Sequence, residues 1–170
     1  FADGMSKILT GKVFNSKMFQ NVHFPEKYWF EDTLCAYILY PMAKNISTIN
    51  ASVYCYLANP YGISAKSMKF DKSIDSFWIT EQLLRDAVSL QLLNDNSIEL
   101  YYEHTIHQIA TNYTRAMFRG KDVRHAIFVL SCNLLDTYFS QCVTKKSEKT
   151  KRIEQAIRNK DYVMFVASVI

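Results

Sequence analysis

Glycine and proline are scarce in this sequence, which has four glycines and three prolines among its 170 residues. Because these residues form most tight turns, their scarcity argues against a sandwich of many short strands and favours long helices with short links. Hydrophobic residues make up 49% of the chain and charged residues 21%. These proportions exclude a disordered chain and predict a folded one with a sizeable core.

The sequence also lacks the cysteine spacing of metal clusters and disulfide scaffolds. Its cysteines form no C-x-x-C pair, so we expect small buried apolar residues in a reducing compartment. They are Cys35, Cys55, Cys132 and Cys142. No apolar run reaches the roughly 18 residues that a membrane-spanning helix needs. We therefore expect a cytoplasmic protein that at most lies against a membrane.

Charge of either sign is too dispersed to indicate nucleic acid as a partner. The net charge is +4, and the basic residues are spread along the chain except for one run near its end. That run contains Lys145, Lys146, Lys149, Lys151 and Arg152. We interpret it as a solvated link between helices, and the alternative is contact with anionic lipid or an acidic acceptor polymer.

After residue 70 the apolar residues recur at steps of three and four, which is typical of helices. The pattern predicts helices over residues 73–93, 98–117, 122–139, 148–159 and 162–169, with Asn96 and Glu99 as a capping box. The first three should pack as one bundle with Ile109, Leu130 and Leu134 buried. Their predicted apolar faces contain Ile74, Phe77, Trp78, Leu84 and Val88, then Tyr102, Ile106, Ile109, Tyr113 and Met117, then Val123, Ile127, Leu130, Leu134 and Tyr138 with Phe128, Leu135 and Phe139 beside them.

Up to about residue 67 the elements are shorter. Residues 6–19 suggest a short helix or strand pair, and residues 22–25 an extended piece. Glu31 and Asp32 precede an apolar run, which predicts a helix over 33–40 because acidic residues favour the positive end of a helix dipole. Residues 46–49 and 53–57 are rich in β-branched and aromatic residues and predict short strands. The expected fold class is mainly α with a small α/β part.

Five short elements follow one another in this first region. They are Phe24-Pro25-Glu26, Trp29-Phe30-Glu31-Asp32-Thr33, Ala43-Lys44-Asn45-Ile46, Val53-Tyr54-Cys55-Tyr56 and Gly62-Ile63-Ser64. In this order and at this spacing, they resemble the second half of the catalytic domain in family-two glycosyltransferases of the GT-A fold. The pattern departs from the family in two places. Leu57 and Ala58 follow Tyr56 where relatives often have an arginine, and the loop reads Gly62-Ile63-Ser64 instead of serine-isoleucine, which puts any phosphate contact by this loop in doubt.

The resemblance implies that residues 1–67 are the acceptor-side segment of a GT-A domain and that 68–170 form an appended helical bundle. It further implies that Asp32 is the general base that takes a proton from the acceptor hydroxyl, while Glu31 and Trp29 contact the acceptor. The chemistry agrees, since displacement at a sugar carbon needs one positioned base. The alternative for the two carboxylates is a helix cap. For Trp29, packing and sugar stacking are both open.

The first half of such a domain binds the nucleotide sugar and presents a D-x-D motif to a metal, and this chain has no D-x-D and no glycine-rich phosphate loop. The chain also begins at Phe1 without a methionine. We therefore expect an inactive fragment without a cofactor or metal, taken from a full-length enzyme that uses Mg²⁺ or Mn²⁺. His104 and His107 beside Glu103 are favoured as a polar helix face over metal ligands.

The full-length enzyme is expected to move a sugar from a nucleotide-sugar donor to a saccharide or other hydroxyl acceptor with inversion, and polysaccharide synthesis would be a typical task. The rival hypothesis is a non-enzymatic helical module whose later helices offer a partner surface.

Overall fold

The computed structural model describes residues 10–55, 57, 59–62, 71–144 and 147–169. Helices dominate this part of the chain, and no strand occurs within it. The order is η1 (Ser16–Phe19), the π-helix η2 (Cys35–Leu39), α1 (Tyr40–Met42), η4 (Asp71–Ile74), α3 (Asp75–Ser89), α4 (Ile98–Ala116), α5 (Lys121–Tyr138), α6 (Glu148–Arg158) and α7 (Tyr162–Val169). The mainly helical fold class is therefore confirmed.

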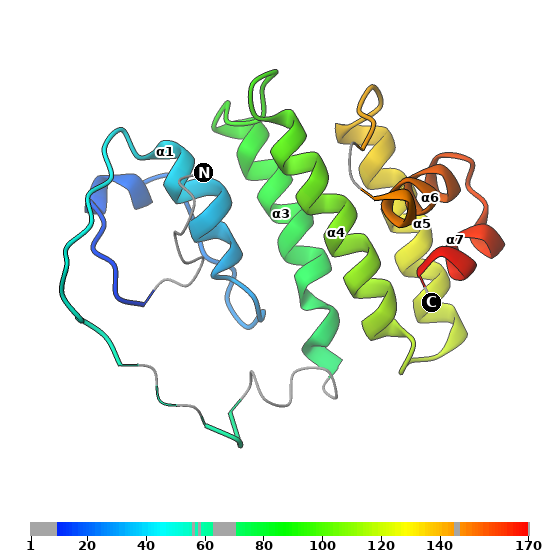
Figure 1. Ribbon diagram of the computed structural model, residues 1–170, viewed down its shortest axis with the longest axis horizontal. Coiled ribbons are helices and arrows are strands. Elements are labelled where there is room, and N and C mark those ends of the chain that lie inside the picture. The colour runs from blue at the N-terminus through cyan, green and yellow to red at the C-terminus, as the bar shows by residue number, and fades with distance from the viewer. Residues whose placement is uncertain (1–9, 56, 58, 63–70, 145–146, 170) are drawn as a thin grey trace.

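Each helix packs on its neighbours in chain order (Figure 1). The η2–α1 segment lies against α3, α3 against α4, and α4 against α5, while α6 contacts both α4 and α5 and α7 packs on α6. The five helices predicted after residue 70 all form, each with bounds that differ from the predicted ones by a few residues at most. They make the bundle that the apolar periodicity indicated.

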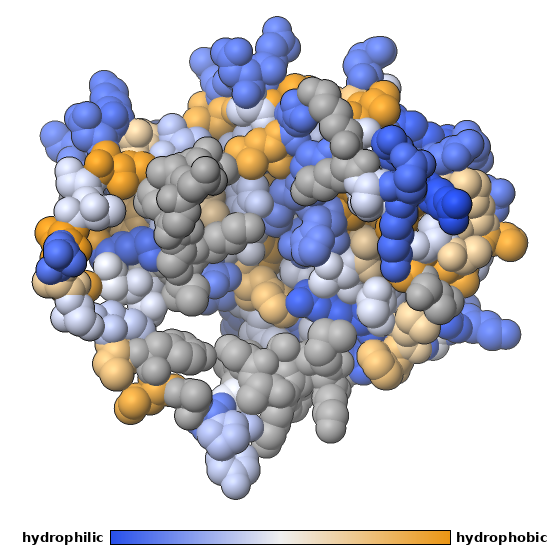
Figure 2. Space-filling model, viewed as in Figure 1, coloured by the Kyte–Doolittle hydropathy of each residue, from blue (hydrophilic) through white to orange (hydrophobic). Residues whose placement is uncertain are grey.

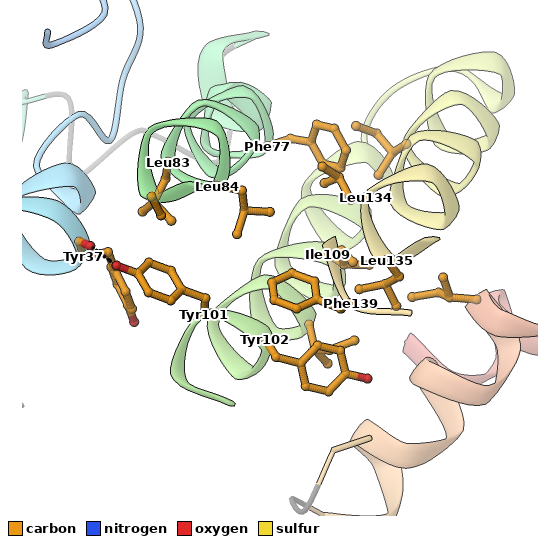
Figure 3. Packing of buried hydrophobic residues seen from close by; sticks show 14 of the residues in the cluster. Tyr37, Phe77, Leu83, Leu84, Tyr101, Tyr102, Ile109, Leu134, Leu135 and Phe139 are labelled. Carbon is orange, nitrogen blue, oxygen red and sulfur yellow. Dashed lines mark hydrogen bonds between the residues drawn. The ribbon is translucent and has the colours of Figure 1, made fainter. Parts of the chain in front are cut away.

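The core lies between α3, α4 and α5 (Figure 3) and extends to η2, α6 and α7. Tyr101 and Tyr102 of α4 point to opposite sides of that helix, toward Tyr37 of η2 and toward Phe139 at the end of α5. Full burial of one such large side chain contributes about 1.5 to 3 kcal/mol. Of the three residues expected in this core, Ile109 and Leu134 are buried and Leu130 is only partly buried.

The predicted inward face of α3 is partly wrong. Phe77 and Leu84 are buried as expected, but Trp78 is 40% exposed and Val88 51% exposed. Leu83 and Ala87 lie inside instead. Apolar residues occur on both sides of this helix, so the period of 3.6 alone could not choose between two stripes about 100° apart.

The α/β part expected before residue 67 is not seen among the described residues. Residues 46–49 and 53–55 are extended but pair with no strand in that part of the chain, and Ile49 and Leu57 are 70% and 82% exposed. Figure 2 shows hydrophobic atoms at the surface along the left edge, where this segment runs. A segment with high strand propensity forms a strand only where a neighbouring strand can pair with its backbone N–H and C=O groups. The boundary predicted at residues 67 and 68 lies outside the described residues, as do residues 6–9 of the first predicted element.

Two smaller expectations also need correction. The N-cap of α4 is Ser97, not the predicted Asn96 with Glu99. The Ser97 hydroxyl accepts a hydrogen bond from the Asn94 amide at 3.0 Å and so ties the link to the helix start. Among the cysteines, Cys35 and Cys132 are buried as expected, whereas Cys55 is exposed and Cys142 is half-buried.

Candidate functional site

The candidate site is the turn that leads into the helix after Asp32. The backbone amides of Leu34 and Cys35 donate to the carbonyls of Glu31 and Asp32 at 3.1 and 3.0 Å, so both carboxylates stand in the first turn. Helical residues run from 33 to 42, and Pro41 lies in the last turn. This confirms the helix predicted for 33–40. The π-helical stretch in its middle was not predicted, and such stretches occur often at functional sites.

Residues of the bundle hold this turn in place. The Trp29 amide donates to Asp75 Oδ2 at 3.0 Å, and the Lys72 ammonium donates to the Lys27 carbonyl. Lys27 and Phe30 have φ angles of 68° and 70°, a left-handed conformation that costs energy for residues with a Cβ atom. Contacts from η4 and α3 therefore fix a backbone conformation that the turn would not prefer alone.

Arg115 of α4 links this turn to the bundle through several contacts. Its guanidinium lies 4.5 Å from the centre of the Phe30 ring, within cation–π range. The same group donates to the Ser73 carbonyl at 3.1 Å and to Ser76 Oγ at 2.6 Å. Burial lowers the pKa of Arg115, but arginine stays charged at any physiological pH. The partly buried Arg115 guanidinium therefore holds Phe30 against the bundle.

Asp32 is half-buried and its electrostatics differ from the sequence-based expectation. Burial raises the pKa of its carboxyl above the ordinary value, and the neighbouring Glu31 raises it further, against a lowering by a hydrogen bond from the Thr33 amide. The helix start was expected to favour the charged form. Desolvation outweighs that effect here, since it penalises the charged carboxylate. A raised pKa makes Asp32 a better proton acceptor once it is ionised.

The other two predicted site residues share this turn. Glu31 is exposed, next to Asp32, and is free to meet a molecule from solution. The Trp29 side chain is half-buried, and its backbone is the part bound to Asp75. All three predicted site residues lie in one turn because they are near neighbours in the sequence, and Asp32 is more shielded from solvent than Glu31.

A shallow groove of about 220 Å³ lies between the loop before this turn and α3. Its lining consists of Pro25, Tyr28, Trp78, Ile79, Glu81, Gln82 and Arg85. Tyr28 is 44% exposed and Trp78 40%, so both rings face solvent in part. Sequence reasoning missed the α3 residues because Trp78 was assigned to the core. The sequence signal that could have revealed them is a spacing of three and four, which places Trp78, Glu81, Gln82 and Arg85 on one helix face.

The histidine pair on α4 shows no metal site. His104 is buried, with its ring centre 4.0 Å from that of Tyr37, whereas His107 is exposed, so the two do not form one ligand face. Glu103 accepts a hydrogen bond from the Thr144 hydroxyl at 2.7 Å. No metal-ligand cluster is found among the described residues. The polar-face interpretation is also wrong in part, because Glu103 and His104 are interior residues.

The surface of α6 carries the described part of the basic run. Lys149, Lys151 and Arg152 are exposed, and Lys151 pairs with Glu148 at 2.7 Å. These residues belong to α6 itself and not to a link between helices, while Lys145 and Lys146 lie outside the described residues. Across the described ranges, none of the helices has the length and apolar character to cross a bilayer.

Comparison of the chain with models of protein families, with curated proteins and with solved structures gives no significant match.

Proposed function

We propose that this chain is the acceptor-side, carboxy-terminal part of a glycosyltransferase related to family two. In the full-length enzyme a sugar would pass, with inversion, from a nucleotide-sugar donor to a hydroxyl of a saccharide acceptor, in the cytoplasm. The donor half would bring the nucleotide site and the aspartates for Mg²⁺ or Mn²⁺. The observation that carries the proposal is the turn at residues 29–32, where Asp32 is half-buried and the bundle contacts the backbone of Trp29 and the ring of Phe30.

The shielding of Asp32 supports its proposed role as the general base. The base must sit near the acceptor hydroxyl, be ionised at neutral pH and still have appreciable affinity for a proton. Burial and the adjacent Glu31 raise the pKa of Asp32 in the required direction. A residue that served only as a cap would gain from a lower pKa, since the helix dipole stabilises a charged cap.

The clamped turn also supports the proposal. Left-handed Phe30 is kept in place by the Arg115 guanidinium, and strained conformations of this kind cluster at functional sites. A simple helix start would not need such a contact. In this proposal the bundle acts as the support that fixes the base relative to the acceptor.

The exposed apolar residues among 46–55 and at 57 fit the same proposal. They are Ile46, Ile49, Val53, Tyr54 and Leu57, all about half exposed or more. Exposed apolar residues that gather on one surface can mark a site that another part of a protein covers. In this proposal the donor half of the enzyme would be that part.

The test is Asp32→Asn in the full-length enzyme. Asn keeps the shape and the capping capacity but cannot take a proton, so we expect turnover to fall by about two to four orders of magnitude. Donor affinity should stay almost constant. Glu31→Gln is the matched control, and it should act mainly on the acceptor KM, as loss of a binding contact does. Near-normal turnover in a folded Asp32→Asn enzyme would remove Asp32 from the mechanism and overturn the proposal.

A further inference from the structure

We infer that the groove between Tyr28 and Trp78 is a saccharide-binding subsite, which holds a sugar unit of a polymeric or oligomeric ligand. Its role as an acceptor subsite rests on the proposed function, but its affinity for saccharide is a property of this chain alone. The carrying observation is that two half-exposed aromatic residues, Tyr28 of the loop and Trp78 of α3, line the same shallow groove together with planar polar side chains.

The aromatic residues supply the apolar contact. The flat face of an aromatic ring suits the C–H face of a sugar ring, because both are apolar and nearly planar. Trp78 packs edge-on against buried Phe77, with ring centres 5.6 Å apart and planes at 87°. That contact anchors the indole and reduces the conformational entropy that a ligand must remove on binding.

The polar residues supply contacts of the kind that sugar hydroxyls make. Glu81 offers acceptors, Arg85 offers donors, and Gln82 offers both, so the set matches hydroxyl groups that donate and accept in turn. Glu81 and Arg85 lie 3.1 Å apart and form an ion pair, which offsets their charges. Gln82 donates to Asp86 at 2.8 Å, which orients its amide group. The offset charges favour an uncharged hydroxyl-rich ligand over an ion.

The size and position of the groove point to one unit of a longer ligand. Pockets for separate small molecules have volumes of about 300 to 1,000 Å³, and this groove is smaller, at about 220 Å³. Pro25 and Tyr28 belong to the loop whose next residue, Trp29, is bonded to the start of α3. A saccharide that lies in the groove therefore contacts the same loop that leads to Glu31 and Asp32.

The experiment measures saccharide binding by the 170-residue chain. Cellohexaose, maltohexaose, chitohexaose and a hyaluronan hexasaccharide are titrated separately while tryptophan fluorescence and isothermal heat are recorded. We expect at least one neutral hexasaccharide to bind, and Trp78→Ala and Tyr28→Ala each to weaken that binding about tenfold or more, since each removes one apolar platform. Trp78→Phe, which keeps a ring, should retain most of the affinity.

Val88→Ala is the matched control, because Val88 is an exposed apolar residue of the same helix outside the groove lining. It should bind as the unchanged chain does, and circular dichroism should report equal helix content for all variants. Absence of binding for all three neutral hexasaccharides would overturn the inference, whether or not the anionic hyaluronan hexasaccharide binds. Equal binding by Trp78→Ala, or binding only of a proline-rich peptide included as a fifth ligand, would also overturn it.

The two proposals fail separately. Saccharide binding that depends on Trp78, together with full turnover of the Asp32→Asn enzyme, would keep the groove and remove the catalytic assignment. Loss of turnover in Asp32→Asn without saccharide binding by the chain would keep the catalytic assignment and remove the groove.

Discussion

Asp32 illustrates how one carboxyl group can serve function at the expense of stability. Folding partly buries this group beside Glu31, and both effects favour its neutral form. A carboxyl whose pKa is raised by folding stabilises the fold fully below its ordinary pKa of 3.8. This contribution is lost as the pH rises through the raised value, because the native state then carries a charge that the unfolded state solvates better. At neutral pH, ionised Asp32 therefore lowers the stability of the chain.

Asp32→Asn should consequently stabilise the folded chain at pH 7 and have almost no effect at pH 3. The amide is neutral at both pH values and can still cap the helix start. Urea unfolding midpoints at the two pH values would measure this difference. Glu26→Gln, at an exposed carboxylate of the same loop, is the control and should show little change at either pH. A clear loss of stability in Asp32→Asn at pH 7 would contradict the desolvation argument.

At the scale of single elements, two helices end without the glycine that usually follows the last helical turn. After α3 the Gln91 and Leu92 amides donate to the carbonyls of Val88 and Ala87, and after α6 the same pattern recurs at residues 156–161. This is the Schellman motif, in which glycine normally takes the left-handed position. Here Gln91 and Lys160 occupy it, with φ angles of 57° and 54°.

We therefore expect Gln91→Gly and Lys160→Gly to stabilise the chain by about 1 kcal/mol each, because glycine has no Cβ atom to clash in this conformation. The ion pair between Lys160 and Asp136 is exposed, so its loss offsets little of the gain. Urea unfolding at neutral pH measures both changes. Gln155→Gly in the middle of α6 is the contrasting control and should destabilise by about 1 kcal/mol. Destabilisation by both cap variants would show that the side chains at these positions contribute packing.

The sequence predicted an element correctly where the signal came from residues close together in the chain, and failed where the structure depends on residues far away in the chain. The helices after residue 70 were predicted because their apolar spacing is a local signal, and most of the α4 face is buried as expected. Residues 46–49 and 53–57 were predicted as strands from propensity alone, and no partner strand occurs among the described residues to fix them in a sheet. The site turn was found through its motif, but Arg115 and Asp75 were not, since they reach it from α4 and α3, over 40 residues away along the chain.

On the scale of the whole molecule, one polar network joins α6 to the rest of the bundle. Glu154 of α6 is buried, and its carboxylate accepts from Arg158 Nε and from the Thr144 amide, both at 2.9 Å. The Arg158 guanidinium also donates to the Tyr102 hydroxyl of α4 and to the Phe139 carbonyl after α5. A single cation thus connects three helices, and the network orients α6 and, through it, α7.

The network predicts a strong coupling between Arg158 and Glu154. Arg158→Met should destabilise the chain by about 2 kcal/mol or more, because it leaves a buried carboxylate with much less compensation. In the double variant with Glu154→Gln, much of that loss should return, since a neutral amide can accept hydrogen bonds without an uncompensated charge. A double-mutant cycle from urea unfolding measures the coupling. Lys151→Met, which removes an exposed ion pair of the same helix, should leave the urea midpoint almost unchanged. If the losses at Arg158 and Glu154 simply add, the two residues act independently, and apolar packing alone positions α6 on the bundle.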